Sequence, residues 1–200
     1  MTNAKLTQQI EFLIEIDRLK GIIRQTLLTD GSRLENSAEH SWHLAMMAIV
    51  LQDYAPGLID ILQVIKMLLV HDLVEIYAGD TFCYDEAANQ DKADREIAAA
   101  EKLFSLLPEA QGKELRNLWQ EFEAGQTIEA RFANALDRLQ PFLQNWQTEG
   151  KTWQVHGITQ TQVEQRMIPV KSGTPEIWPL VQELIADCVD RGFLRESKED

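Results

Sequence analysis

The sequence has few cysteines, and their positions exclude two common kinds of stabilising site. Cys83 and Cys188 are the only two, and they lie far apart in the chain without a CxxC spacing. A disulfide framework needs more cysteines, and a thiolate metal site needs closely spaced pairs. We therefore expect two reduced thiols.

Long hydrophobic runs are also missing. The longest apolar stretches, around residues 44–51 and 64–70, are much shorter than the roughly 20 residues that a membrane-spanning helix requires. The N-terminal segment MTNAKLTQQI lacks the basic start and apolar block of a signal peptide. We expect a soluble, cytoplasmic protein with no membrane partner.

Positive charge is scarce: 19 Lys and Arg residues stand against 32 Asp and Glu, so the formal net charge is −13. A chain this acidic repels the phosphate backbone of DNA or RNA, so a polymeric nucleic-acid partner is not expected. A small phosphorylated molecule is still compatible with this charge. One or two arginines and a cation inside a pocket outweigh surface charges that are distant and screened by solvent.

What the sequence does contain is helical patterning over its whole length. The 200 residues are 44% hydrophobic, enough for one sizeable core, and they show no repeat, no linker and little β-branched alternation. We predict an all-α fold, a single domain over residues 1–200 built as a bundle of about eight to ten helices. Ser37 is expected to cap a central helix, Gly79 to close another, and the final RESKED to be frayed. Helices are predicted at about 7–19, 20–28, 38–54, 58–77, 91–107, 109–123, 128–147, 159–169 and 175–192.

The segment LLVHDLVEIYAGD (68–80) places ionisable groups inside an apolar run. Burying such groups costs several kcal/mol, roughly, unless they are paired or bound to a metal. On a helix, His71 and Glu75 share a face, and Asp72 lies beside it. Asp80 follows Gly79, where it is either a further site residue or a turn residue.

Two other segments carry candidates for the same site. His40 begins an apolar helix in ENSAEHSWH, with His43 one turn later, and Asp137 lies in FANALDRLQPF. Imidazole and carboxylate ligands suit Mn²⁺, Fe²⁺, Co²⁺ or Zn²⁺. Each residue also has a structural interpretation: His40 as a capping residue, His43 as a packing residue, and Asp137 as the ion-pair partner of Arg138.

In combination, these segments resemble the HD superfamily of metal-dependent phosphohydrolases, and in particular its branch of small 5′-deoxynucleotidases. The resemblance covers about residues 18–147, with C-terminal helices at 150–195 expected to pack on this core. It rests on four blocks that occur in the family's order: RLKGIIR (18–24), ENSAEHSWHLA (35–45), LLVHDLVEIYAGD (68–80) and EARFANALDRLQP (129–141). The stretch LWQEF (118–122) supports them.

The resemblance implies a role for each candidate. His40, His71, Asp72 and Asp137 would ligate one divalent metal ion, which sequence does not identify among Mn, Co, Fe, Zn and Mg. Glu75 and Asp80 would be the catalytic residues, in either order as base and acid. Arg24 would bind the substrate phosphate, with Asp80 as a further substrate contact. His43 lies where the family varies and is a further candidate for contact with substrate.

The implied activity is hydrolysis of (deoxy)nucleoside 5′-monophosphates to nucleoside and phosphate. The alternatives are another phosphate ester, such as a nucleoside triphosphate or a cyclic nucleotide, and a catalytically silent metal- and nucleotide-binding module. In the nucleotidase branch the residue after the arginine is often Trp, but here it is Gln25, so a preference for deoxyribose is left open. Trp42, Tyr77 and Phe82 are the candidates for an aromatic side chain near the sugar. A homodimer is the family expectation, and amphipathic helices at both ends and several tryptophans agree with it.

Overall fold

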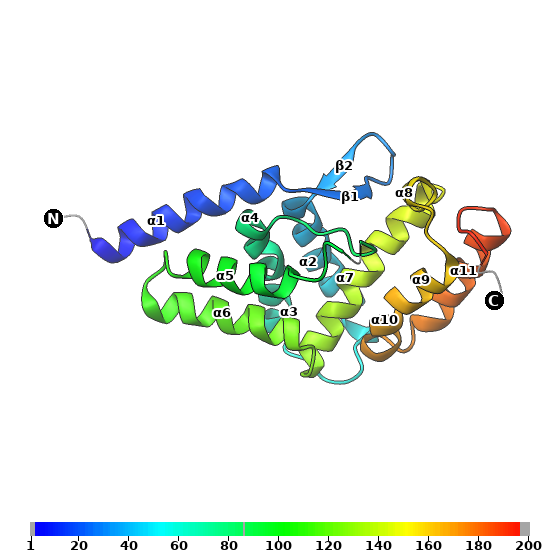
Figure 1. The fold of residues 1–200 in the computed structure, drawn as a ribbon. Coiled ribbons are helices and arrows are strands. Elements are labelled where there is room, and N and C mark those ends of the chain that lie inside the picture. The colour runs from blue at the N-terminus through cyan, green and yellow to red at the C-terminus, as the bar shows by residue number, and fades with distance from the viewer. Residues whose placement is uncertain (1–2, 86, 197–200) are drawn as a thin grey trace.

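Helices form most of the computed structural model, which describes residues 3–85 and 87–196 (Figure 1). No helix in this part of the chain is both long and apolar enough to cross a membrane. The prediction of an all-α fold is confirmed, since the only sheet in the described residues is a short two-stranded hairpin. The elements in chain order are α1 (Ala4–Ile16), β1 (Ile23–Leu27), β2 (Leu34–Asn36), α2 (Ser37–Leu51), α3 (Ile61–Val70), α4 (Glu75–Ala78), α5 (Lys92–Phe104), α6 (Glu109–Ala124), α7 (Ile128–Gln147), α8 (Lys151–His156), α9 (Gln160–Arg166), α10 (Ile168–Gly173) and α11 (Trp178–Asp190), with 3-10 turns at Asp17–Gly21, Gln52–Tyr54 and His71–Val74.

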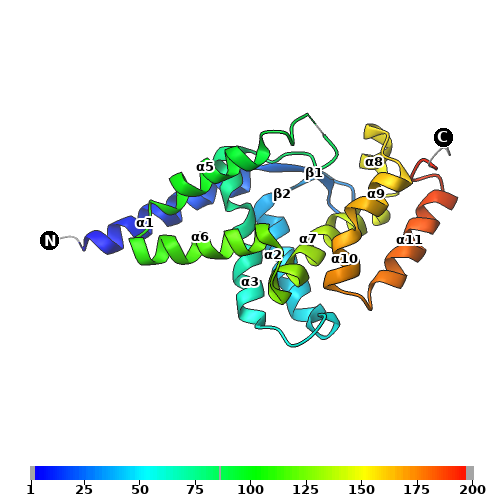
Figure 2. The ribbon, with the colours of Figure 1, turned by 60° about the horizontal axis from the view of Figure 1, so that its bottom comes forward.

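The molecule is elongated, with α2, α3, α4 and α7 in its middle. Figures 1 and 2 show α1, α5 and α6 at one end and α8 to α11 at the other. One hydrophobic cluster joins α2, α3, α7, α10 and α11, and a second joins α1, α4, α5 and α6. The chain passes from the first cluster to the second at the junction of α3 and α4. The polar residues His71 and Asp72 lie at this junction.

The helices α6 and α7 follow their predicted boundaries closely. Gly125 ends α6 with a φ of 59°, and Thr127 caps α7 by accepting a hydrogen bond from the backbone N–H of Ala130 at 3.2 Å. Both signals are local, a glycine that tolerates positive φ and a threonine hydroxyl that accepts from the first turn. These boundaries could therefore be predicted from sequence.

The helix predicted over residues 20–28 is wrong, because this segment forms strand β1. It pairs antiparallel with β2, and the hairpin turn is closed by a hydrogen bond from Leu28 N–H to Arg33 O of 2.9 Å. The β-branched Ile22, Ile23 and Thr26 favour extended backbone, a preference that the apolar spacing concealed. In a strand Arg24 and Thr26 share one face, and both line the same pocket.

Asn36 caps α2, and the prediction of Ser37 as its N-cap is wrong by one residue. The Asn36 side chain accepts from Glu39 N–H at 3.0 Å, and the Glu39 carboxylate accepts from Asn36 N–H at 3.1 Å. This reciprocal pair is a capping box. It leaves the Ser37 hydroxyl free for a different partner, Glu75.

The continuous helix predicted over residues 58–77 is also divided. Asp60 caps α3, which ends at Val70, and a 3-10 turn over His71–Val74 precedes the short α4. Because residues three apart eclipse in a 3-10 turn, Asp72 and Glu75 come closer to one face than on an α-helix. Gly79 follows α4 with a φ of 79°, as predicted for a closing glycine.

The C-terminal part contains more breaks than its sequence pattern predicted. The helix expected at 159–169 is two helices, α9 and α10, since Pro169 lacks the N–H to continue α9 and suits the first turn of α10. Arg195 accepts a hydrogen bond from Gln160 N–H at 3.0 Å, so the expected fraying does not begin there. Residues 197–200 of the predicted frayed end lie outside the described residues.

Gly173 lets α10 approach α7 closely, and replacing it should destabilise the protein. A Cβ atom at this position would lie 2.2 Å from Arg131 O and 2.7 Å from the Ala135 Cβ. Overpacking of this kind costs about 1–3 kcal/mol, which lowers Tm by roughly 2–12 °C in a chain of this length. Thermal unfolding of Gly173→Ala should show this decrease. Gly21→Ala is the control, because nothing lies within 4 Å of its Cβ position, and an equal Tm for both variants would contradict the prediction.

Candidate metal centre

Four side chains from three parts of the fold meet at one buried point. His40 comes from the first turns of α2, His71 and Asp72 from the junction of α3 and α4, and Asp137 from the middle of α7. The His40 Nε2 lies 2.9 Å from Asp137 Oδ1, and the His71 Nε2 lies 3.0 Å from Asp72 Oδ1. Ligand atoms of His40, His71 and Asp72 all lie within 4.8 Å of one another. The structure thus brings together the four residues proposed from sequence as metal ligands.

Both imidazole rings are held so that Nε2 faces the centre of the cluster. The His40 Nδ1 lies 2.9 Å from Gln140 Oε1, and the His71 Nδ1 lies 2.9 Å from Leu68 O. These oxygens can only accept, so each Nδ1 carries a proton, and in the neutral ring that a metal ion requires each Nε2 presents a lone pair. The His71 Nε2 is buried and makes no well-aligned hydrogen bond with the described residues, although Asp72 Oδ1 lies 3.0 Å and Asp137 Oδ1 3.7 Å away. An unsatisfied buried nitrogen aimed at two carboxylates fits a cation at the centre.

The charges of the cluster also favour a cation. Burial opposes a charge on His71, but Asp72 and Asp137 outweigh it and raise the pKa of the imidazole to about 10. Burial similarly opposes ionisation of Asp72, but His71 and Arg24 hold the pKa of its carboxyl below the usual value. The cluster therefore attracts positive charge, from a proton or from a metal ion. Two imidazoles and two carboxylates form a ligand set suited to a first-row divalent metal.

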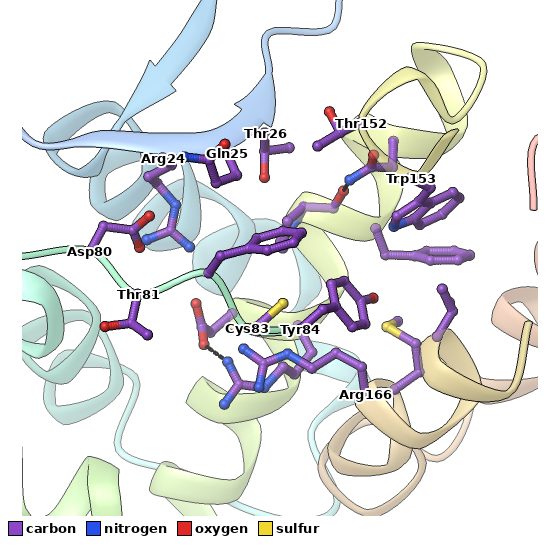
Figure 3. Close-up of a pocket in the computed structure, with 18 of the residues that line it drawn as sticks. Arg24, Gln25, Thr26, Asp80, Thr81, Cys83, Tyr84, Thr152, Trp153 and Arg166 are labelled. Carbon is purple, nitrogen blue, oxygen red and sulfur yellow. Dashed lines mark hydrogen bonds and ion pairs between the residues drawn. The ribbon is translucent and has the colours of Figure 1, made fainter. Parts of the chain in front are cut away.

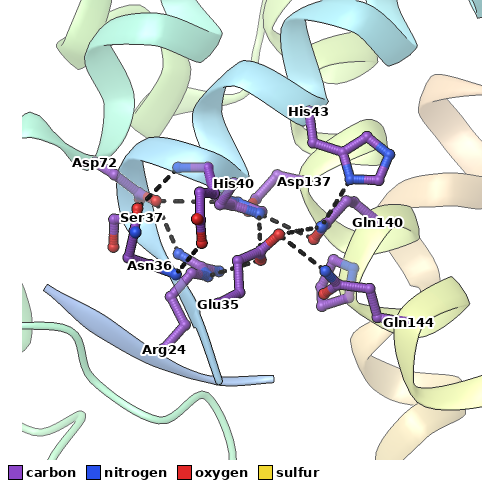
Figure 4. A network of polar contacts seen from close by, with 12 residues as sticks. Arg24, Glu35, Asn36, Ser37, His40, His43, Asp72, Asp137, Gln140 and Gln144 are labelled. Carbon is purple, nitrogen blue, oxygen red and sulfur yellow. Dashed lines mark hydrogen bonds and ion pairs between the residues drawn. The ribbon is translucent and has the colours of Figure 1, made fainter. Parts of the chain in front are cut away.

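A second group of buried polar residues orients the His40 side chain of the cluster through hydrogen bonds (Figure 4). The Glu35 carboxylate accepts hydrogen bonds from the side-chain amides of Gln140 and Gln144, each at 2.8 Å. This orients the Gln140 amide so that its oxygen faces His40. Sequence reasoning missed these three residues, although Gln140 and Gln144 lie three and seven positions after Asp137 and so share its helix face.

Glu35→Gln should weaken metal binding without removing a ligand. A glutamine side chain at position 35 can donate as well as accept, so the Gln140 amide is no longer fixed and the Nδ1–H form of His40 is less favoured. We expect metal affinity to fall about 10- to 100-fold, as for other residues that orient metal ligands. Isothermal titration calorimetry measures the affinity, and histidine ¹⁵N shifts report the tautomer. Glu164→Gln on the exposed side of α9 is the control, and an unchanged affinity in Glu35→Gln would contradict the assigned role.

Arg24, Glu75 and Asp80 line the pocket that adjoins the cluster. Figure 3 shows Arg24 and Asp80 on one side of this pocket. The Arg24 Nη1 donates to Asp72 Oδ2 at 2.8 Å, and the Ser37 hydroxyl donates to Glu75 Oε2 at 2.7 Å. Burial and the Asp72 charge raise the pKa of Glu75 to about 9, and burial raises the pKa of Asp80 as well. The pocket thus combines a guanidinium with two carboxyl groups that hold protons more tightly than usual.

His43 does not share this pocket. Its Nδ1 lies 3.2 Å from the Gln140 side-chain nitrogen, and its ring lines a separate apolar cavity between α2 and α7. Among the aromatic candidates, Phe82 lines the main pocket, whereas Trp42 is 65% exposed and the Tyr77 ring packs against Lys102. Gln25 lines the pocket beside Arg24.

Buried imidazoles and carboxylates that meet at one point of a helical fold are typical of α-helical metal-binding proteins. The fold and the site place this chain in that class. The family model described as an HD domain matches residues 16–178. The human protein named 5′-deoxynucleotidase HDDC2 is 31% identical over 179 residues, which cover 89% of this chain and 85% of the human one. The Dictyostelium discoideum protein of the same name is 30% identical, over 75% of this chain and 82% of its own. The chain belongs to the HD domain family.

A solved structure of a bacterial protein is similar over almost the whole chain. It is described as a predicted metal-dependent phosphohydrolase from Magnetospirillum magnetotacticum, and it is 51% identical with a TM-score of 0.92 over 96% of both chains. The similarity includes α8 to α11, which follow the motif segments in sequence. The resemblance to the HD superfamily found in the sequence is confirmed.

Proposed function

We propose that this protein is a metal-dependent phosphomonoesterase that hydrolyses (deoxy)nucleoside 5′-monophosphates to nucleoside and phosphate. The observation that carries the proposal is the position of Arg24, Glu75 and Asp80 in one pocket against the metal cluster. Holding a metal would not require these three groups, but phosphate transfer to water requires an anion-binding group and proton carriers. The curated relatives named 5′-deoxynucleotidases support the choice of substrate.

In this proposal His40, His71, Asp72 and Asp137 hold one divalent ion, from among Mn, Co, Fe, Zn and Mg. Such an ion supplies Lewis-acid polarisation of the phosphate and lowers the pKa of a bound water. The fit rests on the convergent Nε2 atoms and on the unsatisfied His71 Nε2. The ligand atoms select poorly among these metals, so availability decides which is bound.

The other side chains bind substrate and move protons. The Arg24 guanidinium can hold two phosphate oxygens through its planar fork. Its pKa is raised above the ordinary value, since nearby carboxylates outweigh burial, so it keeps its charge. One of Glu75 and Asp80 accepts the proton of the attacking water, and the other donates a proton to the leaving sugar oxygen. Either residue can take either role. Their pKa values are raised, chiefly by burial, so each carboxyl holds a proton more tightly than it would in water.

Phosphate release from a panel of ribo- and deoxyribonucleoside 5′-monophosphates tests the proposal. Protein stripped of metal should be inactive, and Mn²⁺, Co²⁺, Mg²⁺ or Zn²⁺ should restore turnover. The ratio of deoxy to ribo substrates then measures what Gln25 does at the sugar. Release from no monophosphate, by protein that binds metal, would reject this function.

We further propose a homodimer located in the cytoplasm. The apolar side chains Ile10, Leu13 and Ile14 lie 48%, 58% and 68% exposed on α1, and Trp42 and Val50 are exposed on α2. These faces, and not Trp119 or Trp153, which are buried, supply the apolar surface for a second copy. The two free cysteines suit a reducing compartment. Sedimentation equilibrium should give twice the mass of the chain, and a monomer at micromolar concentration would contradict the dimer.

A further inference from the structure

A second group of cations lies in the same pocket, away from Arg24. Arg138 follows Asp137 on α7, and Arg166 ends α9, in a part of the chain outside the motif segments. Arg138 forms an ion pair with Asp137. Arg166 makes no hydrogen bond or ion pair with any residue in the described part of the chain, and Figure 3 shows its guanidinium directed into the pocket.

The two guanidinium groups are close enough to repel each other. Burial and then the Arg138 charge lower the pKa of Arg166 below the ordinary arginine value. Guanidinium groups have only N–H donors and no acceptor. This end of the pocket therefore presents N–H donors, and those of Arg166 make no hydrogen bond with the described residues.

Aromatic side chains form the walls beside these donors. Phe82, Tyr84 and Trp153 line the pocket, and the Trp153 side chain is 3% exposed. Flat apolar walls favour a planar ring, whereas a second phosphate group would favour further polar contacts and water. The chemistry of this end therefore fits the base of a nucleotide whose phosphate lies at Arg24.

We propose that Arg166, assisted by Arg138, makes the enzyme select bases that carry a carbonyl oxygen where adenine and cytosine carry an amino group. Guanine and hypoxanthine present O6 beside the acceptor N7, which suits an arginine fork, while thymine and uracil present O4 to a single N–H. Adenine and cytosine turn an N–H donor toward the guanidinium groups, so the site leaves these groups unpaired. This inference rests on the proposed function, and it names the part of the substrate class that the site prefers.

Two substrate pairs isolate this difference, dUMP against dCMP and dIMP against dAMP. Within each pair the ring size and sugar are the same, while the carbonyl and amino groups exchange. We expect the carbonyl member of each pair to have the higher kcat/KM, by about tenfold to a hundredfold for dIMP, the range of one bidentate arginine contact, and by less for dUMP, which offers one acceptor. In Arg166→Gln the ratio should approach one, because an amide can donate or accept. Both substrates of a pair are measured on the same preparation, so the ratio of their kcat/KM values does not depend on the fraction of folded protein.

Arg131→Gln is the matched control, since this arginine is exposed on α7 and does not line the pocket. It should keep the ratio of wild type. Equal rates within both pairs in wild type, or an equal loss for all bases in Arg166→Gln, would overturn the inference while leaving the phosphatase activity established. A preference for a nucleoside 3′,5′-bisphosphate that depends on Arg166, without base selection, would show an anion site and overturn it too.

Binding measurements separate this inference from the proposed function. Calorimetric affinity of metal-stripped protein for dUMP and dCMP needs no turnover. If no monophosphate is hydrolysed but dUMP binds more tightly through Arg166, the function fails and the base preference stands. Equal affinities would reject the base preference independently of any activity.

Discussion

Replacing Glu75 by glutamine should lower kcat by about 10²- to 10⁴-fold, the usual loss when a general acid or base is removed. The side chain is 6% exposed and lines the pocket beside Asp72. A glutamine keeps its size and can still accept from Ser37, but it neither takes up nor releases a proton. Metal affinity should be unchanged, since Glu75 is not among the residues that converge on the cluster.

The matched control is Glu96→Gln. Glu96 is equally buried at 6% exposure, and burial raises the pKa of its carboxyl too, but it does not line the pocket. Steady-state kinetics should therefore show a large loss in Glu75→Gln alone. A kcat within about threefold of wild type would remove Glu75 from the proton-transfer step. Loss of metal together with activity would assign it a structural role instead.

The same substitution should stabilise the metal-free protein. Burial and Asp72 raise the pKa of Glu75 from 4.5 to about 9, so the protonated carboxyl is favoured in the folded state. Its contribution to stability is complete below pH 4.5 and is lost as pH rises through about 9. Glu75→Gln avoids this loss, so its Tm relative to wild type should increase across that window. A difference in Tm that stays constant with pH would contradict the raised pKa.

Most of the fold and the residues of the candidate metal centre could be predicted from the sequence, because their signals are local or depend on spacing. The bounds of α7 follow from a cap, a glycine and a helical apolar pattern. His71 and Asp72 were recognisable as polar residues inside an apolar run. Their convergence with His40 and Asp137 came from the family resemblance and not from the spacing, which left other interpretations open.

The parts that sequence did not predict depend on tertiary contacts. The hairpin that carries Arg24 exists through pairing of β1 with β2, and the sequence of β1 alone also fits a helix. Glu35 lies in a three-residue strand with no motif of its own, and its role is visible only through Gln140 and Gln144. Arg166 reaches the pocket because α10, which directly follows α9, packs against α7.

Asp137→Asn should abolish tight metal binding. Asp137 Oδ1 lies 2.9 Å from His40 Nε2 and 3.7 Å from His71 Nε2, where it would share a cation with both. Its carboxyl has a pKa well below the ordinary value, because Arg138, His40 and His71 outweigh the effect of burial. Asparagine removes the charge and leaves only a neutral oxygen. Since residues that merely orient ligands change affinity about 10- to 100-fold, loss of a ligand should exceed about 100-fold.

Thermal unfolding with and without metal measures this loss independently of activity. At a metal concentration about 1,000 times Kd, binding stabilises wild type by about 4 kcal/mol, which raises Tm by roughly 8–16 °C in a chain of this length. Asp137→Asn at the same concentration should show almost no increase. Asp187→Asn is the matched control, because its half-exposed carboxylate pairs with Arg191 at 3.2 Å and accepts from Trp146 Nε1 at 3.0 Å, and it is not one of the four cluster residues. If Asp137→Asn kept the wild-type increase, the ion would be held elsewhere, and the buried carboxylate on α7 would serve only to balance the charges of Arg138 and the two histidines.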